Sequence, residues 1–358
     1  MEQQNNHGLF HSSLQNKKVL SFGELLLRIC PDINGEWLQT NTLPFYVGGA
    51  EANAATALAL WNISTAYLSI IPDNIISKQL VEYLNSKKID ASKMLLQGDK
   101  MGLYFLPKGN DLKHTSVIYD RSNSSFSQVQ KGIINWDDVL KDVGWFHYSA
   151  ISPAINQNVA DVCKEALEAA SKRNIVISVD LNYRAKLWQY GKEPIDVMTE
   201  LTSYCNVVMG NLWSAEKMLG LEVDKNLSTQ SSRQAYLDHA VRTSEQIIHN
   251  FPSCKVVAKT FRFDAVSDSI DYYATLFADD KLYQSKEYHA EKIADKVGSG
   301  DCFMAGIIYG LYNHQSYQNI LDVATAAAFS KLFVEGDAIN KTVDEIENFV
   351  KRYETRHQ

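Results

Sequence analysis

The sequence predicts an α/β fold with a mostly parallel, doubly wound central sheet and a smaller accessory sheet. Short β-branched or apolar runs alternate with helical segments through most of the chain, which is typical of parallel strands joined by crossover helices. Two β-rich stretches, at about 32–47 and 100–125, interrupt this alternation. We therefore expect these two stretches to form a separate sheet that covers a cleft.

The composition is that of an ordinary globular protein. The chain has 358 residues, of which 45% are apolar and 22% are charged, and this length can bury a large core in one α/β domain. The formal net charge is −7 and no dense Lys/Arg block occurs, which argues against a nucleic acid or an anionic membrane as a partner. No stretch is long and apolar enough to cross a membrane.

The leader and the cysteines indicate where the protein resides. Residues 1–17 are polar and lack the apolar core of a secretory signal, so we expect a frayed leader followed by a single domain over 18–353. The cysteines are odd in number, widely spaced and free of any Cys-x-x-Cys pair. A disulfide framework or a zinc site is therefore not expected, and a cytoplasmic location is.

The elements of the first half follow from apolar runs and turn residues. Lys18 to Cys30 is predicted to form a buried strand and a second short one, and the pair Gly48-Gly49 opens an Ala-rich helix. Pro72 and Asp73 separate the next strand from the next helix. The expected strands are 18–30, 37–47, 64–71, 102–106, 115–119 and 143–149, and the expected helices are 50–61 and one that ends near 83.

The second half alternates short β-branched runs with helices and ends in helices alone. Apolar residues recur with helical periodicity over 156–172. An apolar helix follows directly after the segment Gly298 to Asp301. The expected strands are 175–180, 207–209 and 256–259, and the expected helices are 156–172, 302–312, 324–333 and 343–351.

The segment Gly298-Ser299-Gly300-Asp301 predicts an anion site. Two glycines around a serine permit a turn that aims successive N–H groups in one direction, and the helix start adds unpaired donors and a partial positive charge. A plain capped helix would explain the same four residues. A Walker loop is absent, and Phe303 stands where a dinucleotide fingerprint requires its third glycine.

A second glycine-rich segment is Gly48-Gly49-Ala50-Glu51-Ala52-Asn53. The small residues let a backbone approach a ligand closely, and Asn53 can hydrogen-bond a hydroxyl from the first helical turn. Close packing of a helix on a sheet would also use small residues at these positions. Taken alone, this segment favours packing.

Together, the two segments resemble the two signatures of the ribokinase family of sugar kinases. The N-terminal signature is Gly-Gly-x-x-x-Asn and the C-terminal one is Asp-x-x-Gly-Ser-Gly-Asp, in the order and with the wide separation of that family. The resemblance covers about residues 18–353. It implies a ribokinase-like three-layer α/β/α sandwich with a mostly parallel central sheet, and a small β-sheet lid at 32–47 and 100–125.

Further segments are similar to the 2-keto-3-deoxygluconate kinases of that family. These segments are 23–28, 102–105, 119–121, 146–151, 180–184 with 187–188, and 336–337. The resemblance implies a catalytic set of Asp301 as the base, Gly298, Ser299 and Gly300 as phosphoryl-binding residues, and Arg184. The implied substrate-binding residues are Gly48, Gly49, Asn53, Tyr104, Tyr119, Arg121, Ile151 and Asp337. The implied cofactor-binding residues are Asn211, Thr260, Gly298 and Gly300, and no side chain is implied as a direct metal ligand.

The chain departs from the family pattern at several positions. The usual Asn-x-x-Glu motif becomes Asn211 to Ser214, with the nearest acidic residue at Glu216. The glycines of the usual nucleotide loop are missing from Lys259 to Asp264, and Lys296 replaces a common threonine. These changes concern the nucleotide side of the site.

The resemblance implies transfer of the ATP γ-phosphoryl group to the primary hydroxyl of 2-keto-3-deoxygluconate. Mg²⁺ would bridge phosphate oxygens, a requirement for a monovalent cation stays open, and a homo-oligomer formed through the lid is expected. Two alternatives remain. One is a fructokinase-like kinase for another sugar, and the other is a catalytically silent sugar- or nucleotide-binding regulator.

Overall fold

A computed structural model describes residues 14, 16–31, 41–107, 117–227, 232–264 and 269–356. Its main sheet has ten strands in the order β15-β14-β13-β12-β11-β10-β1-β4-β6, with β16 paired to β14. Neighbours from β13 to β6 are parallel, whereas β14, β15 and β16 pair in antiparallel fashion. The strands are β1 (Lys18–Phe22), β4 (Thr65–Leu68), β6 (Ile89–Asp90), β10 (Val143–Ser149), β11 (Val176–Asp180), β12 (Val207–Met209), β13 (Val256–Asp264), β14 (Ile270–Ala278), β15 (Lys281–Gln284) and β16 (Tyr288–Ala290).

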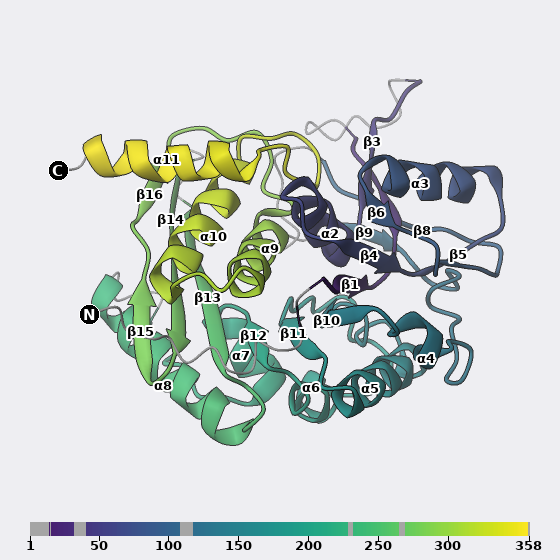
Figure 1. The fold of residues 1–358 in the computed structure, drawn as a ribbon, viewed down its shortest axis with the longest axis horizontal. Helices are drawn as coiled ribbons and strands as arrows, with labels where there is room; N and C mark the ends of the chain where they lie inside the picture. The colour runs from purple at the N-terminus through teal and green to yellow at the C-terminus, as the bar shows by residue number, and fades with distance from the viewer. Residues whose placement is uncertain are drawn as a thin grey trace.

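Helices cover both faces of this sheet, which completes the predicted three layers (Figure 1). On one side lie α2 (Ala50–Leu60), α9 (Ser299–Tyr312), α10 (Tyr317–Lys331) and α11 (Val343–Arg356). On the other side lie α4 (Trp136–Val139), α5 (Gln157–Lys172), α6 (Pro194–Thr202), α7 (Leu212–Leu219) and α8 (Arg233–Asn250). Successive residues of β10 serve the two layers, since Trp145 packs into the first core and Phe146 into the second. Because helices cover both faces of the sheet, its parallel strands are rich in apolar and β-branched residues.

A separate four-stranded sheet has the order β3-β2-β8-β9. Its strands are β3 (Phe45–Gly48), β2 (Leu26–Ile29), β8 (Gly102–Phe105) and β9 (Ile118–Asp120), and nearby β5 (Ile70–Ile71) pairs with β7 (Leu95–Leu96) beside α3 (Ile75–Ser86). The predicted accessory sheet is therefore present. The predicted lid residues 32–40 and 108–116 lie outside the described ranges.

Three boundaries differ from the sequence-based expectations. Helix α9 begins at Ser299, three residues early, because Gly298 adopts the left-handed conformation and acts as its N-cap. Helix α10 begins at Tyr317, where Ser316 Oγ accepts a hydrogen bond from the N–H of Asn319. Residues Lys259 to Asp264 continue β13 instead of forming a loop, because β14 pairs with them throughout.

The described part of the chain contains no helix that is long and apolar enough to cross a membrane. All five cysteine thiols are buried and free.

Candidate active site

A cavity of about 450 Å³ opens at the carboxyl ends of the central parallel strands. Asp180 at the end of β11 and Met209 at the end of β12 line it from the main sheet, and Tyr104 of β8 lines it from the small sheet. The first turns of α2 and α9 complete the wall. This edge is where open α/β sheets bind ligands, because helix N-termini and strand ends converge there.

The N-terminus of α9 carries the residues for which the sequence predicts an anion site. Gly298 has φ 81°, and a Cβ added to it would stand 1.7 Å from the carbonyl oxygen of Asp337, so only glycine fits. Ser299 Oγ donates a hydrogen bond to the carbonyl of Ala328 at 2.9 Å, which fixes the turn from below. The first N–H groups of a helix lack carbonyl partners within the helix, and the residues from Gly298 to Asp301 line the cavity.

Gly300 differs from Gly298 in its backbone conformation and in the space around it. It lies inside α9 with ordinary helical geometry, and a Cβ added to it would meet only Met209 Cε, at 3.8 Å. Protein packing therefore does not demand a glycine at this position. Gly300 lines the cavity, so a ligand group could occupy the open space beside it.

Asp301 lies in the first turn of α9, buried at the cavity wall. Its Oδ2 accepts a hydrogen bond from Asn53 Nδ2 of α2 at 2.7 Å. Burial raises the pKa of Asp301 to about 8, the hydrogen bond from Asn53 opposes that rise, and the carboxylates of Asp180 and Glu51 add to it. The group therefore titrates close to physiological pH, as a proton acceptor in catalysis requires.

Two further carboxyl groups line the same wall and were not predicted. Glu51 Oε1 accepts hydrogen bonds from the N–H of Ser149 at 2.9 Å and from its Oγ at 2.7 Å. Burial raises the pKa of Glu51, and burial also raises the pKa of Asp180 to about 7 against the attraction of Arg184. Both residues lie inside segments that the sequence marked, and their acidic side chains at a helix start and a strand end were the available signal.

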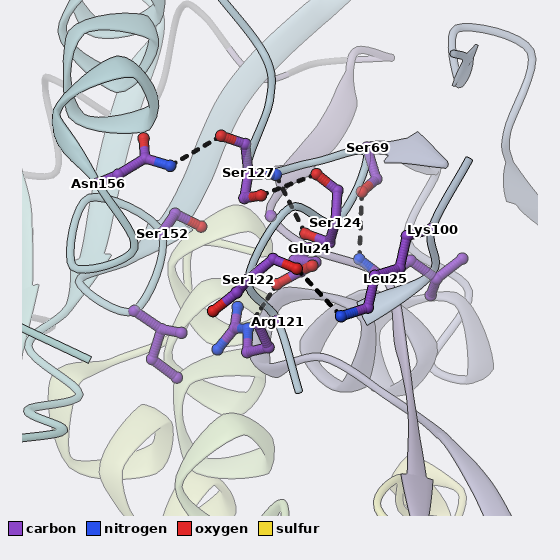
Figure 2. Close-up of polar contacts among 12 residues, drawn as sticks. Glu24, Leu25, Ser69, Lys100, Arg121, Ser122, Ser124, Ser127, Ser152 and Asn156 are labelled. Atoms are coloured by element: carbon purple, nitrogen blue, oxygen red, sulfur yellow. Dashed lines mark hydrogen bonds and ion pairs between the residues drawn. The ribbon is translucent and has the colours of Figure 1, made fainter. Parts of the chain in front are cut away.

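Arg121 enters the cavity from the turn after β9 and is paired with a buried acid. Its Nε lies 2.5 Å from Glu24 Oε2, and both side chains are more than nine-tenths buried. Figure 2 shows this pair together with the hydrogen bond from Lys100 Nζ to the carbonyl of Ser122, at 3.0 Å, which holds the same turn. The Ser127 Oγ to Ser124 carbonyl contact, at 2.8 Å, closes the turn. The guanidinium is thus positioned by a built network, and within the described ranges no hydrogen bond is formed by its Nη groups.

Arg184 approaches the cavity from the segment after β11. Its Nη1 donates a hydrogen bond to the carbonyl of Tyr183 at 3.1 Å. Within the described residues, its Nε is buried without a hydrogen-bond partner. An unsatisfied buried donor at a cavity wall indicates a ligand acceptor.

The predicted substrate residues fall into two groups. Thirteen of the predicted site positions line the cavity, namely Gly49, Asn53, Tyr104, Tyr119, Arg121, Ile151, Arg184, Asn211, Thr260, Gly298, Ser299, Gly300 and Asp301. Gly48 and Asp337 do not belong to its lining. Asp337 instead accepts hydrogen bonds from Arg28 Nη1 at 2.9 Å and from Tyr104 Oη at 2.6 Å. Two buried donors thus engage the carboxylate of Asp337, and the substrate contact implied for it stays a prediction.

The part of the cavity formed by β13 and α7 lacks the glycine loop that is usual in the family, as the sequence indicated. Asn211 caps α7, since its Oδ1 accepts a hydrogen bond from the N–H of Ser214 at 2.8 Å. Thr260, Arg262 and Phe263 of β13 line the wall together with Trp213. Aromatic and cationic side chains thus line the wall where the usual family pattern has glycines.

Two basic residues, Arg262 and Lys296, line this part of the cavity, whereas Glu216 does not. Asp264 Oδ1 lies 3.3 Å from Arg262 Nε and 3.5 Å from Lys296 Nζ, and both cations line the cavity. Glu216 is absent from the lining and lies 3.9 Å from Lys217 Nζ on the surface of α7. It therefore does not replace the acidic residue missing at Ser214.

The comparisons with known proteins agree with this geometry. The sequence profile described as pfkB family carbohydrate kinase matches residues 16–342. The chain is 25% identical over 338 residues to a 2-dehydro-3-deoxygalactonokinase of Haloferax volcanii, across 93% of this chain and 96% of that one. It is 25% identical over 333 residues to a 5-dehydro-2-deoxygluconokinase of Geobacillus thermodenitrificans, across 90% and 91%. The crystal structure of a 2-dehydro-3-deoxygluconokinase from Thermotoga maritima matches with a TM-score of 0.84 at 28% identity, across 94% of this chain and 99% of that one. The profile match over residues 16–342, which is most of the chain, shows that the chain belongs to the pfkB family of carbohydrate kinases.

Proposed function

We propose that this kinase transfers the γ-phosphoryl group of ATP to the primary hydroxyl of 2-dehydro-3-deoxygluconate, that is, 2-keto-3-deoxygluconate. The observation that carries the proposal is one cavity with Asp301 and the open side of Gly300 in its wall, and the buried guanidinium of Arg121 in the same wall. The three relatives reported above are named for dehydro-deoxygluconate or dehydro-deoxygalactonate acceptors. A carboxylate is the feature that these acceptors share.

Asp301 acts as the general base in this proposal. In its ionised form the carboxylate accepts the proton of the acceptor hydroxyl, mainly late in a loose transition state. Asn53 holds the carboxylate in place through the 2.7 Å hydrogen bond. The N–H groups at Gly298 to Gly300 stabilise the negative charge on the transferring phosphoryl group, and the partly unsatisfied guanidinium of Arg184 supports them.

The acceptor is held at the end of the cavity under the small sheet. The Nη groups of Arg121 form a planar fork that matches a carboxylate, because a guanidinium can donate two parallel hydrogen bonds. Tyr104 and Tyr119 supply rings against the carbon chain, with centroids 6.4 Å apart. Closure of this sheet over the acceptor would exclude water and limit ATP hydrolysis.

The nucleotide occupies the end formed by β13 and α7. Trp213 and Phe263 are 39% and 36% exposed and line this end, so both can pack against an adenine ring. Thr260 and Asn211 lie beside them, and Arg262 and Lys296 add positive charge for the phosphates. Mg²⁺ would be held at this end mainly through the phosphates of the nucleotide, where it would neutralise their charge.

The small sheet also supports the proposal of a homo-oligomer. Cross-strand pairing places Phe45, Ile29, Phe105 and Ile118 in one row across its four strands. Phe45 is 60% exposed and Ile118 is 50% exposed at the two ends of that row. A second copy of the sheet would cover these apolar side chains.

A phosphorylation assay over a panel of acceptors, with ADP detection, tests the proposed function. The panel contains 2-dehydro-3-deoxygluconate, 2-dehydro-3-deoxygalactonate, 5-dehydro-2-deoxygluconate, gluconate, fructose and ribose. We expect the highest kcat/KM with 2-dehydro-3-deoxygluconate. Preference for fructose would favour the fructokinase-like alternative, and sugar or nucleotide binding without ADP release would favour the regulator.

Replacement of Arg121 should separate acids from neutral sugars. We expect Arg121→Ala to raise KM for sugar acids by at least ~10-fold and to raise KM for neutral sugars much less, because a carboxylate loses its charged hydrogen bonds. Steady-state kinetics on matched acid and neutral acceptors measure the difference. Equal increases for the two classes would remove the carboxylate role of Arg121.

A control is needed because Arg121→Ala leaves the carboxylate of Glu24 buried and unpaired, at a cost on the order of 3–5 kcal/mol in folding free energy. The double variant Arg121→Met, Glu24→Gln removes the charge of both partners and keeps most of the packing. Glu24→Gln alone keeps the guanidinium and should leave the preference for acids in place.

A further inference from the structure

Lys331 is a fully buried lysine that the proposed reaction does not use. It is the last residue of α10, and its relative exposure is 0%. Its Nζ donates a hydrogen bond to the carbonyl of Val334 at 3.0 Å. Burial of an ammonium group is costly unless nearby groups stabilise its charge, so the surroundings of Lys331 require an explanation.

Lys331 lies behind Gly298 to Gly300, the residues proposed to bind a phosphoryl group, which we call the phosphate turn. A Cβ added to Gly298 would lie 3.4 Å from Lys331 Cε and 1.7 Å from the carbonyl oxygen of Asp337. The lysine side chain therefore packs directly behind the residue that starts the anion site. Gly298 itself lines the cavity, so Lys331 lies next to a residue of the cavity wall.

Three further charges complete a buried cluster. Arg28 Nη1 lies 2.8 Å from Asp295 Oδ2 and 2.9 Å from Asp337 Oδ1, with all three side chains almost inaccessible. Burial lowers the pKa of Lys331, whereas the negative charges of Asp295 and Asp337 raise it. With Lys331 protonated, the cluster holds two positive and two negative charges and is neutral.

We propose that Lys331 is a built-in cation that balances the carboxylates behind the phosphate turn, so that this kinase needs no monovalent cation. The inference rests on the proposed function, since it assumes that Gly298 to Gly300 bind a phosphoryl group. Without Lys331, one guanidinium faces two carboxylates. The net negative charge would then lie in a low-dielectric region behind the position where anionic phosphate must dock, and would weaken its binding.

The chain offers a matched control in Lys259. It is also buried, with 1% exposure, and its Nζ donates a hydrogen bond to Ser244 Oγ of α8 at 2.6 Å. Lys259 does not line the cavity. A lysine that acts only through burial should therefore respond like Lys259, and a lysine that serves the phosphate turn should not.

The experiment compares Lys331→Ala, Lys331→Met and Lys259→Met with the unchanged chain. Each protein is assayed at equal ionic strength in the chloride of potassium, ammonium or tetramethylammonium. We expect the unchanged chain and Lys259→Met to have similar kcat/KM for ATP in all three salts. In tetramethylammonium chloride, Lys331→Ala should lose about 10- to 100-fold, below the range for loss of a direct donor because Lys331 acts through the turn.

The decisive result is whether a small cation restores the activity of Lys331→Ala. Potassium or ammonium should restore much of the activity of Lys331→Ala, because a small cation can enter the space that the lysine vacates. The methionine of Lys331→Met fills this space, so the same salts should restore little. A requirement of the unchanged chain for potassium, or a Lys331→Ala variant with unchanged kinetics or without rescue, would overturn the proposal.

Calorimetric binding of a non-hydrolysable ATP analogue, in the same three salts, provides a readout that does not depend on turnover. Its affinity should follow the same pattern across the variants. If the unchanged chain phosphorylates no acceptor, the proposed function fails, yet the binding pattern still decides the role of Lys331. Should neither Lys331 variant fold, the salt dependence of nucleotide binding by the unchanged chain decides alone, with potassium dependence as the contrary result.

Discussion

Asp301→Asn is expected to lower kcat by at least ~10²-fold while KM for the acceptor changes little, because the variant loses a positioned general base and keeps the shape of the cavity. An amide nitrogen or oxygen can still face Asn53, so the contact between α2 and α9 can persist. Steady-state kinetics with 2-dehydro-3-deoxygluconate and ATP measure both parameters. Turnover near that of the unchanged chain would exclude Asp301 as the base.

The pH dependence supplies a second test of the same residue. Asp301 accepts a proton only when ionised, and burial raises its pKa to about 8. Activity should therefore rise from pH 6 toward pH 8 and level off above it, with a contribution from Asp180, whose pKa is raised to about 7. Asp301→Asn should lose the upper part of this rise.

Glu216→Gln is the matched control for Asp301→Asn. Both substitutions replace an acid by its amide, but Glu216 lies outside the cavity lining. Its kinetics and pH profile should equal those of the unchanged chain. A strong effect at Glu216 would mean that the nucleotide site extends farther along α7 than the cavity indicates.

Gly300→Ala should abolish most of the activity without harm to the fold. The new methyl group would meet only Met209 Cε, at 3.8 Å, so it projects into the space proposed for the phosphoryl group. Alanine inside a helix is also more stable than glycine, by about 0.5–1 kcal/mol. We expect kcat/KM for ATP to fall at least ~10²-fold, on the scale of losing a transition-state donor, with an unchanged or higher Tm.

Gly298→Ala, in contrast to Gly300→Ala, should lower the stability of the fold. Its left-handed conformation costs a residue with a Cβ about 1–2 kcal/mol, and the clash with the Asp337 carbonyl adds to that cost. Thermal unfolding and ATP kinetics on both variants make the comparison. A destabilised Gly300→Ala with normal kinetics would show that Gly300 serves packing, and would remove its proposed role in phosphate binding.

Much of the architecture could be predicted from the sequence because local patterns decide it. Strand β10 was predicted at its observed bounds, since all seven of its residues are buried and most of its side chains are apolar or aromatic. The edge strands β14 to β16 were missed. They are antiparallel and pair with the unexpected extension of β13, and such pairing depends on residues distant in the chain.

For the candidate site, too, the sequence indicated some features and not others. The resemblance of two short motifs assigned Asn53 and Asp301 to the same predicted site, although they are far apart in the chain. In the structure, Asn53 Nδ2 lies 2.7 Å from Asp301 Oδ2. It did not reveal that Glu24 would pair with Arg121, or that Arg28 would occupy the carboxylate of Asp337. Ion pairs of this kind are set by side-chain geometry that no spacing in the sequence records.

By itself, the sequence determined the order of the parallel strands and most of the helices, the glycine turn before Asp301 and the family that these motifs indicate, because backbone conformation and apolar periodicity are local properties. The tertiary structure alone decided which charges share a buried space. The pKa of Asp301, the neutral cluster of Arg28, Lys331, Asp295 and Asp337, and the open side of Gly300 all depend on distances between segments that only folding brings together. Desolvation and Coulomb energies vary with those distances, so they cannot be deduced from residue order.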